Sequence, residues 1–335
     1  MQTSAGSDSD PGTDRSDPPA AIELDGLQKV YGNTTAVADL SLTVPVGTVF
    51  GFLGPNGAGK STTIDVLMDY VRPTAGTATV LGLDAQTQTQ AVRRRVGVLP
   101  DGYGLYDRLT ARQHLSFAID LKGAETDPEQ LLDRVGLDPT AADRPVGGYS
   151  KGMAQRLSLA IALVGDPDLL ILDEPSAGLD PNGVRLVREI VRDHAARGKT
   201  VFFSSHILSQ VEAVCDQVAI LDQGRLVAVD TIDGLRDGLD PGGTVELTLG
   251  TVPADVTVGD LPGVTSATVT DDILRVQVAR PEAKVAVIDR VREDGGTILD
   301  LAITEPSLDD LFSAYTARGP NAPGGPDHEA EGRDR

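Results

Sequence analysis

Hydrophobic positions follow two different patterns along the first two thirds of the chain. Residues 22–24 and 40–44 alternate apolar and polar side chains, which is typical of antiparallel strands with one exposed face. Residues 48–53, 169–172 and 200–203 are instead apolar almost without interruption. Uninterrupted runs of this length predict strands that are buried on both faces of a parallel sheet.

Helical patterns separate these apolar runs, so residues 21–236 are expected to form one α/β domain. We expect a mainly parallel sheet with helices on both faces and an antiparallel β-layer near residues 22–50. A stretch at about 104–165 carries helix signals without a convincing strand. This stretch is predicted to be a helical insert in the sheet domain.

The composition changes at residues 237–243 (DGLDPGG), which are predicted to be a linker because Gly, Pro and Asp dominate them. Beyond the linker, residues 244–317 are expected to form a small α+β domain. Its strands are predicted from short segments of alternating polarity at residues 245–249, 264–269, 273–278 and 298–303.

Two helices are expected in this small domain. The first begins at Pro281, a residue that is favoured in the first helical turn. Its expected buried face is formed by Val285, Ile288 and Val291. The second runs from Pro306 to about Tyr315, with Ser307 as its N-cap.

The ends of the chain differ from both domains. Residues 1–20 and 318–335 are rich in Asp, Pro, Gly and other small or polar residues, and they are predicted to be disordered because they offer little apolar surface to bury. The N-terminus has no apolar segment of the kind that a signal peptide needs. No apolar run approaches the roughly 20 residues of a membrane-spanning helix, so we expect a soluble chain.

Charge is strongly unbalanced, with 50 acidic against 29 basic residues and a net charge of −21. Asp outnumbers Glu by 38 to 12, and Lys occurs only 6 times against 23 Arg. This composition favours an origin in a salt-loving organism, a halophilic archaeon, where molar salt would screen the self-repulsion. The acidic balance argues against a nucleic-acid partner. Cys215 is the single cysteine, which excludes an intramolecular disulfide and fits a reducing compartment.

A glycine-rich loop follows the first buried strand and precedes a helical pattern. Its residues, which fit the pattern G-x-x-x-x-G-K-[ST], are Gly54, Pro55, Asn56, Gly57, Ala58, Gly59, Lys60 and Ser61. Glycines let the backbone N–H groups converge on phosphates, and the helix N-terminus adds a positive dipole end. Lys60 is expected to contact the β- and γ-phosphates, and the Ser61 hydroxyl is expected to bind Mg²⁺.

Two further segments carry candidate chemistry. Residues 169–172 end in Asp173 and Glu174, which predicts a magnesium-binding carboxylate and a general base at the carboxyl edge of the sheet. Residues 149–153 place a hydroxyl and a glycine at the start of an apolar helix, another position suited to an anion. Because the first loop already holds the phosphates of one nucleotide, this second site is expected to face a nucleotide bound to another copy.

The order of these segments resembles the ATP-binding subunits of ABC transporters over residues 22 to about 235. Residues 54–61 match the Walker A loop, and residues 169–174 match the Walker B strand. The signature motif corresponds to Tyr149, Ser150, Lys151, Gly152 and Met153, and the D-loop to Ser176, Ala177, Gly178, Leu179 and Asp180.

The resemblance implies further roles. Tyr31 matches the aromatic residue that stacks on adenine. His206 matches the switch histidine, which is expected to hydrogen-bond the γ-phosphate and to position the attacking water in catalysis. The implied nucleotide-binding set is Tyr31, Gly54, Pro55, Asn56, Gly57, Ala58, Gly59, Lys60, Ser61 and Thr62. The implied magnesium ligands are Ser61, Asp173 and Asp101. ATP and Mg²⁺ are the implied cofactors.

Asp101 departs from the family pattern, which usually has Gln at this position. A carboxylate can still bind Mg²⁺, but it adds a negative charge and cannot donate a hydrogen bond when it is ionised. We interpret Asp101 as a residue that tunes coupling, and not as a sign of an inactive site.

The end of the chain suggests a subfamily. Residues 306–312 resemble the C-terminal segment of exporter-type subunits of the ABC-2 kind, which pair with a separately encoded membrane permease. The resemblance implies a homodimer or heterodimer in the cytoplasm, attached peripherally to the inner face of the membrane, that powers export. Two alternatives remain open at this point: a soluble ABC-type ATPase of DNA repair or translation, and a regulatory nucleotide switch with poor turnover. The role of the small domain is also open: it is either a cap that covers the edge of the catalytic domain or a dimer-stabilising or regulatory module.

Overall fold

The computed structural model describes residues 19–102, 104–237, 243–251 and 257–304. Several predicted segments fall outside the described residues: residues 1–18 and 318–335 of the two tails, residues 238–242 of the linker, and the second helix of the small domain at residues 306–315.

An antiparallel sheet covers one side of the first domain, as the alternating segments predict. Its strand order is β2-β1-β4-β5. Ile22 of β1 pairs with Val44 of β2, and Leu24 pairs with Leu42, so their side chains share the buried face. The strands are β1 (Ala20–Tyr31), β2 (Thr34–Pro45), β4 (Ala75–Val80) and β5 (Leu83–Asp84).

The three continuous apolar runs form neighbouring strands of a second sheet, whose order is β10-β9-β3-β8-β7-β6. All of these strands are parallel to their neighbours except β10, which runs antiparallel to β9. Every residue of β3, β7 and β8 is buried, which confirms the prediction from their composition. The strands are β3 (Val49–Leu53), β6 (Val96–Leu99), β7 (Leu169–Asp173), β8 (Thr200–Ser205), β9 (Gln217–Asp222) and β10 (Arg225–Thr231).

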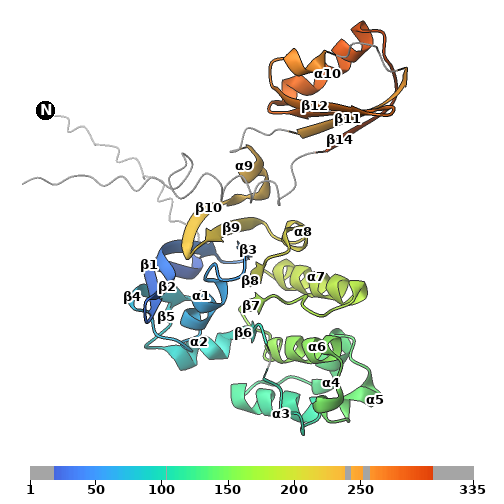
Figure 1. Ribbon diagram of the computed structural model, residues 1–335. Helices are drawn as coiled ribbons and strands as arrows, with labels where there is room; N and C mark the ends of the chain where they lie inside the picture. Colours follow the sequence, from blue (N-terminus) through green and yellow to red (C-terminus); the bar gives the residue numbers. More distant parts are fainter. Residues whose placement is uncertain (1–18, 103, 238–242, 252–256, 305–335) are drawn as a thin grey trace, which may run out of the picture.

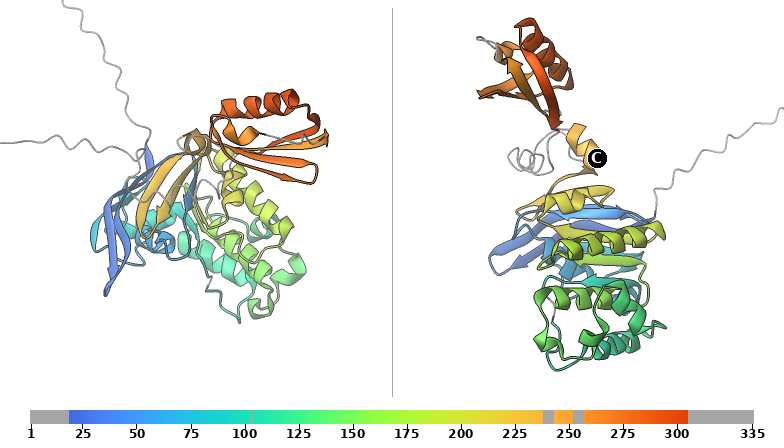
Figure 2. Two further views of the ribbon diagram at one scale, coloured as in Figure 1. Left: turned by 45° about the horizontal axis from the view of Figure 1, so that its top comes forward. Right: turned by 90° about the vertical axis from the view of Figure 1, so that its right-hand side faces the viewer.

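Successive side chains of the parallel strands enter two different cores. Phe50 and Phe52 of β3 pack with Phe202 and with the antiparallel sheet. Val49 and Leu53 belong to a second core formed with helices on the opposite face. Figure 2 shows these layers, with the antiparallel strands in blue on one side and the green helices on the other. The helices that flank the sheet are α1 (Lys60–Leu67), α2 (Thr89–Arg95), α6 (Lys151–Ala162), α7 (Pro181–Ala196) and α8 (Leu208–Glu212).

The predicted helical insert occupies one end of the first domain, at the bottom of Figure 1. It contains α3 (Ala111–Lys122), α4 (Pro128–Arg134) and α5 (Pro139–Ala142), followed by a 3₁₀ turn (Val146–Gly148) that leads into α6. Local sequence explains where these helices begin. Thr110 forms a capping box with Gln113, and Asp127 and Asp138 accept backbone N–H bonds at the starts of the next two helices.

The small domain is a four-stranded antiparallel sheet with a helix packed on one face. The strand order is β12-β13-β11-β14. The predicted strands are all present, as β11 (Gly243–Thr251), β12 (Val264–Thr270), β13 (Ile273–Val278) and β14 (Thr297–Thr304). A short helix α9 (Ile232–Asp237) precedes the sheet, and a 3₁₀ turn (Val258–Asp260) lies between β11 and β12.

The predicted buried face of α10 (Pro281–Glu293) is partly wrong. Val285 is 60% exposed, whereas Ala283, Val287 and Val291 are buried. These three residues are spaced by four and therefore form one stripe, and Val285 lies about 200° from Val287 around the helix axis. Ala283 belongs to the buried core of the small domain, and the predicted face of Val285, Ile288 and Val291 does not include it.

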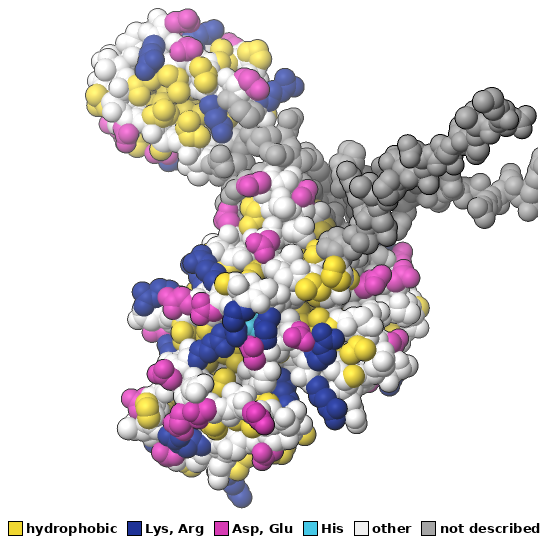
Figure 3. All heavy atoms as spheres, turned by 180° about the vertical axis from the view of Figure 1, so that it is seen from behind, with side chains coloured by type: hydrophobic (Ala, Val, Ile, Leu, Met, Phe, Trp, Pro, Cys, Tyr) yellow, Lys and Arg dark blue, Asp and Glu magenta, His cyan; other side chains and the backbone are white. Residues whose placement is uncertain are grey.

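A charged cluster lies where strands β7 and β8 begin, at the end of the sheet away from the phosphate loop. Asp166 accepts ion pairs from Arg197 and Lys199, both at 2.6 Å. His194 of α7 is fully buried beside them, and its Nδ1 lies 3.2 Å from the Arg197 guanidinium. Burial and the neighbouring Arg197 and Lys199 lower the pKa of His194 to about 4, so it is neutral at pH 7. Figure 3 shows Lys and Arg side chains gathered on the face behind Figure 1.

Because His194 is buried and neutral, we predict that the stability of the folded protein decreases in acid. The unfolded chain binds a proton at this histidine near pH 6.5, whereas the folded chain resists protonation until about pH 4. The free energy of unfolding should therefore fall by about 3 kcal/mol as the pH is lowered through this window. In His194→Asn, which keeps an acceptor for Arg197, that part of the slope should be absent. Urea unfolding at several pH values between 4.5 and 7 measures it, and equal slopes in both proteins would contradict the assignment.

Candidate functional site

The phosphate loop of residues 54–61 connects β3 to α1, as the sequence predicts. Gly57 and Gly59 have φ angles of 84° and 102°, in the region that only glycine adopts readily. A Cβ on Gly59 would lie 2.5 Å from the carbonyl oxygen of Ala36, and a Cβ on Gly54 would lie 2.6 Å from that of Leu221. The glycines are therefore required both for backbone conformation and for close packing of the loop on its neighbours.

Lys60 places a buried positive charge in the middle of the loop. Its side chain is 6% exposed, and Nζ donates a hydrogen bond to the carbonyl oxygen of Gly54 at 2.6 Å. Nζ also lies 3.9 Å from Oε1 of Glu174. Burial lowers the pKa of Lys60, while Glu174, Asp173 and Asp101 oppose that shift. The positive charge of Lys60 therefore lies where it can offset the negative charges of the carboxylates in the site.

The carboxylates are held by the two neighbouring strands β7 and β8. Asp173 ends β7 and is 3% exposed, and the Ser204 hydroxyl of β8 donates a hydrogen bond to its Oδ1. Glu174 leaves the strand with φ at 48°, a left-handed conformation that is uncommon outside glycine. Its backbone N–H bonds to the carbonyl oxygen of Ser204 at 3.2 Å. This turn aims the Glu174 side chain toward Lys60.

His206 and Ser205 orient the Glu174 carboxylate. Nδ1 of His206 lies 2.8 Å from Oε1 of Glu174, and the Ser205 hydroxyl lies 3.4 Å from Oε2. His206 is half exposed, whereas the Glu174 side chain is mostly buried. The structure therefore brings together Lys60, Glu174 and His206, the residues that the sequence places in the phosphate and catalytic sites.

A magnesium ion fits this site only if the nucleotide supplies part of the coordination. Among the described residues, no group of three or more His, Cys, Asp or Glu side chains is arranged to hold a metal. Ser61 is exposed in the first turn of α1, and α1 packs against β7, which ends at Asp173. A hydroxyl and a carboxylate are oxygen donors of the kind Mg²⁺ prefers together with phosphate oxygens.

Asp101 lies at the same site. A cleft of about 270 Å³ opens beside the carboxylates. It is lined by Pro100, Asp101, Gly102, Lys151, Gln155, Asp173, Glu174, Ala177 and Gly178. The residue that departs from the family pattern is thus an exposed third carboxylate that lines the same cleft as Asp173 and Glu174.

The signature segment begins α6 and packs against the D-loop of the same chain. Ser150 is the N-cap, and its hydroxyl accepts the Met153 N–H at 3.3 Å. A Cβ on Gly152 would lie 3.5 Å from the carbonyl oxygen of Gly178. In the D-loop, Asp180 caps α7 by accepting the N–H of Gly183 at 2.8 Å. Both segments therefore hold the amino ends of their helices in fixed positions.

Tyr31 lies at the end of β1, with 45% of its side chain exposed. The hairpin of β1 and β2 reaches the phosphate loop through Ala36, whose carbonyl oxygen contacts Gly59. The aromatic ring therefore lies on a hairpin that packs against the phosphate loop.

Two residues of the site were not found from the sequence. Ser204 bonds to Asp173, and the buried Gln155 donates from Nε2 to the carbonyl oxygen of Pro175 at 3.0 Å. Gln155 thereby holds the turn that follows Glu174. Neither residue has a local signal, because its partner lies 20 or more positions away in the chain.

The phosphate loop gives a prediction with an internal control. Gly59→Ala and Gly57→Ala both force an L-residue into a left-handed conformation, at a cost of about 1–2 kcal/mol. Only Gly59→Ala also brings a Cβ against a backbone carbonyl, because Gly57 has open space around it. ATP affinity, measured by titration with a fluorescent analogue, should fall by at least about tenfold more for Gly59→Ala. Equal losses would show that the contact with Ala36 is unimportant.

Comparison with known families and proteins agrees with this geometry. Residues 37–177 match the ABC transporter family, and residues 231–316 match the family described as "ATP-binding protein DrrA1-3-like, C-terminal domain". The chain is similar to a solved "ATP binding subunit of ABC transporter", with a TM-score of 0.61 and 30% identity, over 65% of this chain and 92% of that one.

Two relatives match over nearly their whole length. One is the daunorubicin resistance ATP-binding protein DrrA3 of Streptomyces coeruleorubidus, which is 37% identical over 88% of this chain and 96% of the relative. The other is the Nod factor export ATP-binding protein I of Sinorhizobium fredii, which is 35% identical over 93% of this chain and 90% of the relative. The chain therefore belongs to the ATP-binding subunits of ABC transporters, the ATPases of that family, and carries a DrrA-like C-terminal domain.

Proposed function

We propose that this subunit hydrolyses ATP with Mg²⁺ to power export through a separate membrane-spanning partner. The observation that carries the proposal is the meeting of Lys60, Glu174 and His206 at the carboxyl edge of the parallel sheet. The relatives named for drug resistance and for Nod factor export support the direction of transport. The relatives named above give no support to a regulatory switch or to a soluble ATPase of DNA repair or translation.

The chain's own residues suggest how hydrolysis proceeds. The loop N–H groups and Lys60 hold the phosphates, and Tyr31 stacks on adenine. Ser61, Asp173 and Asp101 would hold Mg²⁺, which when bound neutralises charge on the phosphates. Glu174 takes a proton from the attacking water, and His206 keeps the carboxylate in position.

We further infer that the active unit is a dimer. Ser150 and Gly152 lie at the amino end of α6, a helix of 12 residues whose dipole favours an anion. The phosphates of the chain's own nucleotide are already held by residues 54–61. These two residues are therefore free to contact the nucleotide of a second copy, in a homodimer or with a related subunit.

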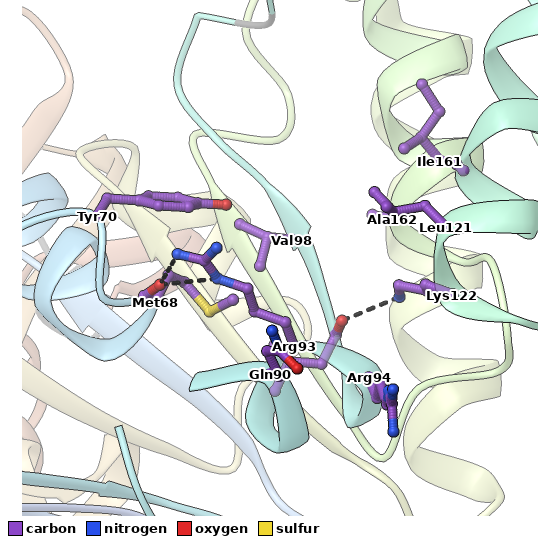
Figure 4. A pocket seen from close by; sticks show the side chains of 12 residues that line it. Met68, Tyr70, Gln90, Arg93, Arg94, Val98, Leu121, Lys122, Ile161 and Ala162 are labelled. Atoms are coloured by element: carbon purple, nitrogen blue, oxygen red, sulfur yellow. Dashed lines mark hydrogen bonds between the residues drawn. The ribbon is translucent and has the colours of Figure 1, made fainter. Parts of the chain in front are cut away.

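An apolar groove between the sheet domain and the helical insert is our candidate for the site of the membrane partner. It has a volume of about 550 Å³. Figure 4 shows Tyr70, Arg93 and Val98 on one wall and Leu121, Lys122 and Ile161 on the other. Tyr70 and Leu121 both line the groove and are exposed, at 56% and 75%, so the groove offers apolar surface that a partner could cover.

The groove is physically connected to the nucleotide site. Strand β6 contributes Val96 and Val98 to the groove and then leads into Pro100 and Asp101 of the cleft. The Lys122 ammonium donates to the carbonyl oxygens of Val96 and Val164 at 3.0 and 3.1 Å, and burial lowers the pKa of Lys122 to about 8. A partner seated in the groove would therefore act on the strand that carries Asp101.

The contact between β6 and α6 is unusually close. A Cβ on Gly97 would lie 2.0 Å from the carbonyl oxygen of Ala162, so no side chain fits there. This contact joins the strand that leads to Asp101 to the helix that begins at Ser150.

None of the helices in the described part of the chain is long and apolar enough to cross a bilayer. We propose peripheral attachment to the inner face of the membrane through the groove. The salt-loving archaeal origin stays a prediction from composition; the relatives named above come from bacteria.

Glu174→Gln tests the catalytic assignment. The amide cannot accept the proton, so steady-state ATP hydrolysis should fall by about 10²–10⁴-fold while ATP binding is retained. Glu189→Gln, an exposed position on α7, serves as the control and should keep wild-type activity. Turnover of Glu174→Gln within twofold of wild type would exclude its role as the general base.

Leu121→Asp tests the groove. The side chain is 75% exposed, so the variant should fold and hydrolyse ATP normally. The fraction that sediments with membranes of the source cells should drop by at least about fivefold, because a desolvated carboxylate in an apolar contact is costly. Val285→Asp, at another exposed apolar position in the small domain, is the control. Unchanged sedimentation of Leu121→Asp would place the membrane contact elsewhere.

A further inference from the structure

Lys29 lies against the ring of Tyr31. The two residues are separated by one position near the end of β1. Nζ of Lys29 is 4.8 Å from the centroid of the Tyr31 ring, within the range of a cation–π interaction. One face of the exposed ring is therefore occupied by a cation of the same chain.

Lys29 is itself anchored to the segment that follows the phosphate helix. Its Nζ donates a hydrogen bond to the carbonyl oxygen of Arg72 at 2.7 Å. Two more bonds hold the same edge of β1: Val30 N–H to Thr74 Oγ1 at 3.0 Å, and Thr74 N–H to the carbonyl oxygen of Gln28 at 2.7 Å. The end of β1 is thus clamped to residues 72–74, a few positions beyond α1.

We propose that Lys29 is a positioning residue of the nucleotide site, which fixes the Tyr31 ring and leaves its opposite face for adenine. The proposal rests on the adenine role proposed above for Tyr31. Lys29 is half-buried and has no carboxylate partner among the described residues, so its charge is directed to the ring and to one carbonyl group. A tyrosine whose ring is already held loses less side-chain freedom when a base stacks on it.

The hydrogen bond from Lys29 to the carbonyl oxygen of Arg72 also connects the Tyr31 ring to the phosphate-binding part of the site. Helix α1 carries Lys60 and Ser61 at its amino end, and residues 68–72 continue from its carboxyl end. The ring that stacks on the base is therefore tied, through Lys29, to the chain segment that leaves the phosphate-binding helix. Lys29 contributes to the affinity for the base without contacting the reacting atoms.

The test is a double-mutant cycle of Lys29→Met and Tyr31→Ala, read as the KM for ATP and as kcat. Methionine keeps the length of the side chain and removes its charge. Lys29→Met should raise KM by about two- to fivefold, the range that a surface cation–π contact provides, and leave kcat within twofold. Lys29→Arg should restore KM. In the Tyr31→Ala background, Lys29→Met should have no further effect.

Inhibition by inorganic tripolyphosphate separates positioning from a general loss of structure. This ligand has phosphates and no base, so its inhibition constant should be the same in wild type and Lys29→Met. A weakened inhibition would mean that Lys29 only supports the phosphate loop and would overturn the proposal, as would additive effects of the two substitutions.

The adenine site and the role of Lys29 can be refuted separately. If Tyr31→Ala leaves KM for ATP unchanged, the adenine site itself is wrong. If Tyr31→Ala raises KM and Lys29→Met in the wild-type background does not, the adenine site stands and the role of Lys29 is refuted. Lys284→Met, in the small domain, is the control for loss of a lysine and should match wild type.

Discussion

Burial of the parallel sheet on both faces is the constraint from which the rest of this structure follows. Every residue of β3, β7 and β8 is buried, and their apolar side chains fill two cores, so the polar side chains of these strands are confined to the strand ends. Hydrogen-bonding and charged groups gather where the strands end. At the carboxyl edge they form the phosphate loop and the carboxylates, and at the amino edge they form the ion pairs of Asp166.

At the carboxyl edge of the sheet, the positive charge of one lysine offsets the negative charges of several carboxylates. Lys60 is buried against loop carbonyl groups and faces Glu174, with Asp173 and Asp101 nearby. Replacing the usual amide by Asp101 makes this balance more acidic. One more negative charge would make the site depend more strongly on its cations, which are Lys60 and the Mg²⁺ that we propose to bind with the nucleotide.

Local sequence patterns predicted the strands, helices and loops better than the side-chain contacts between them. The apolar runs, the loop at residues 54–61 and the acids after β7 were all readable, because each depends on neighbouring positions. The pairs that complete the site were not: Ser204 with Asp173, Gln155 with Pro175, and Lys29 with the Tyr31 ring. These contacts depend on strand register and on the packing of distant segments. The misplaced face of α10 has the same origin, since its orientation is set by the sheet it covers.

The missing side chain at Gly97 has a mechanical consequence. Because β6 and α6 touch there without any intervening atoms, a push on the helix is transferred to the strand instead of being absorbed by a compliant layer. A helix of 12 residues behaves as a short stiff rod. In a dimer, the nucleotide of one copy that contacts Ser150 of the other copy could displace α6 of that other copy. The close contact at Gly97 would pass this displacement to β6 and so to Asp101, which lies beside the other copy's own nucleotide. The two nucleotide sites would thereby be mechanically coupled.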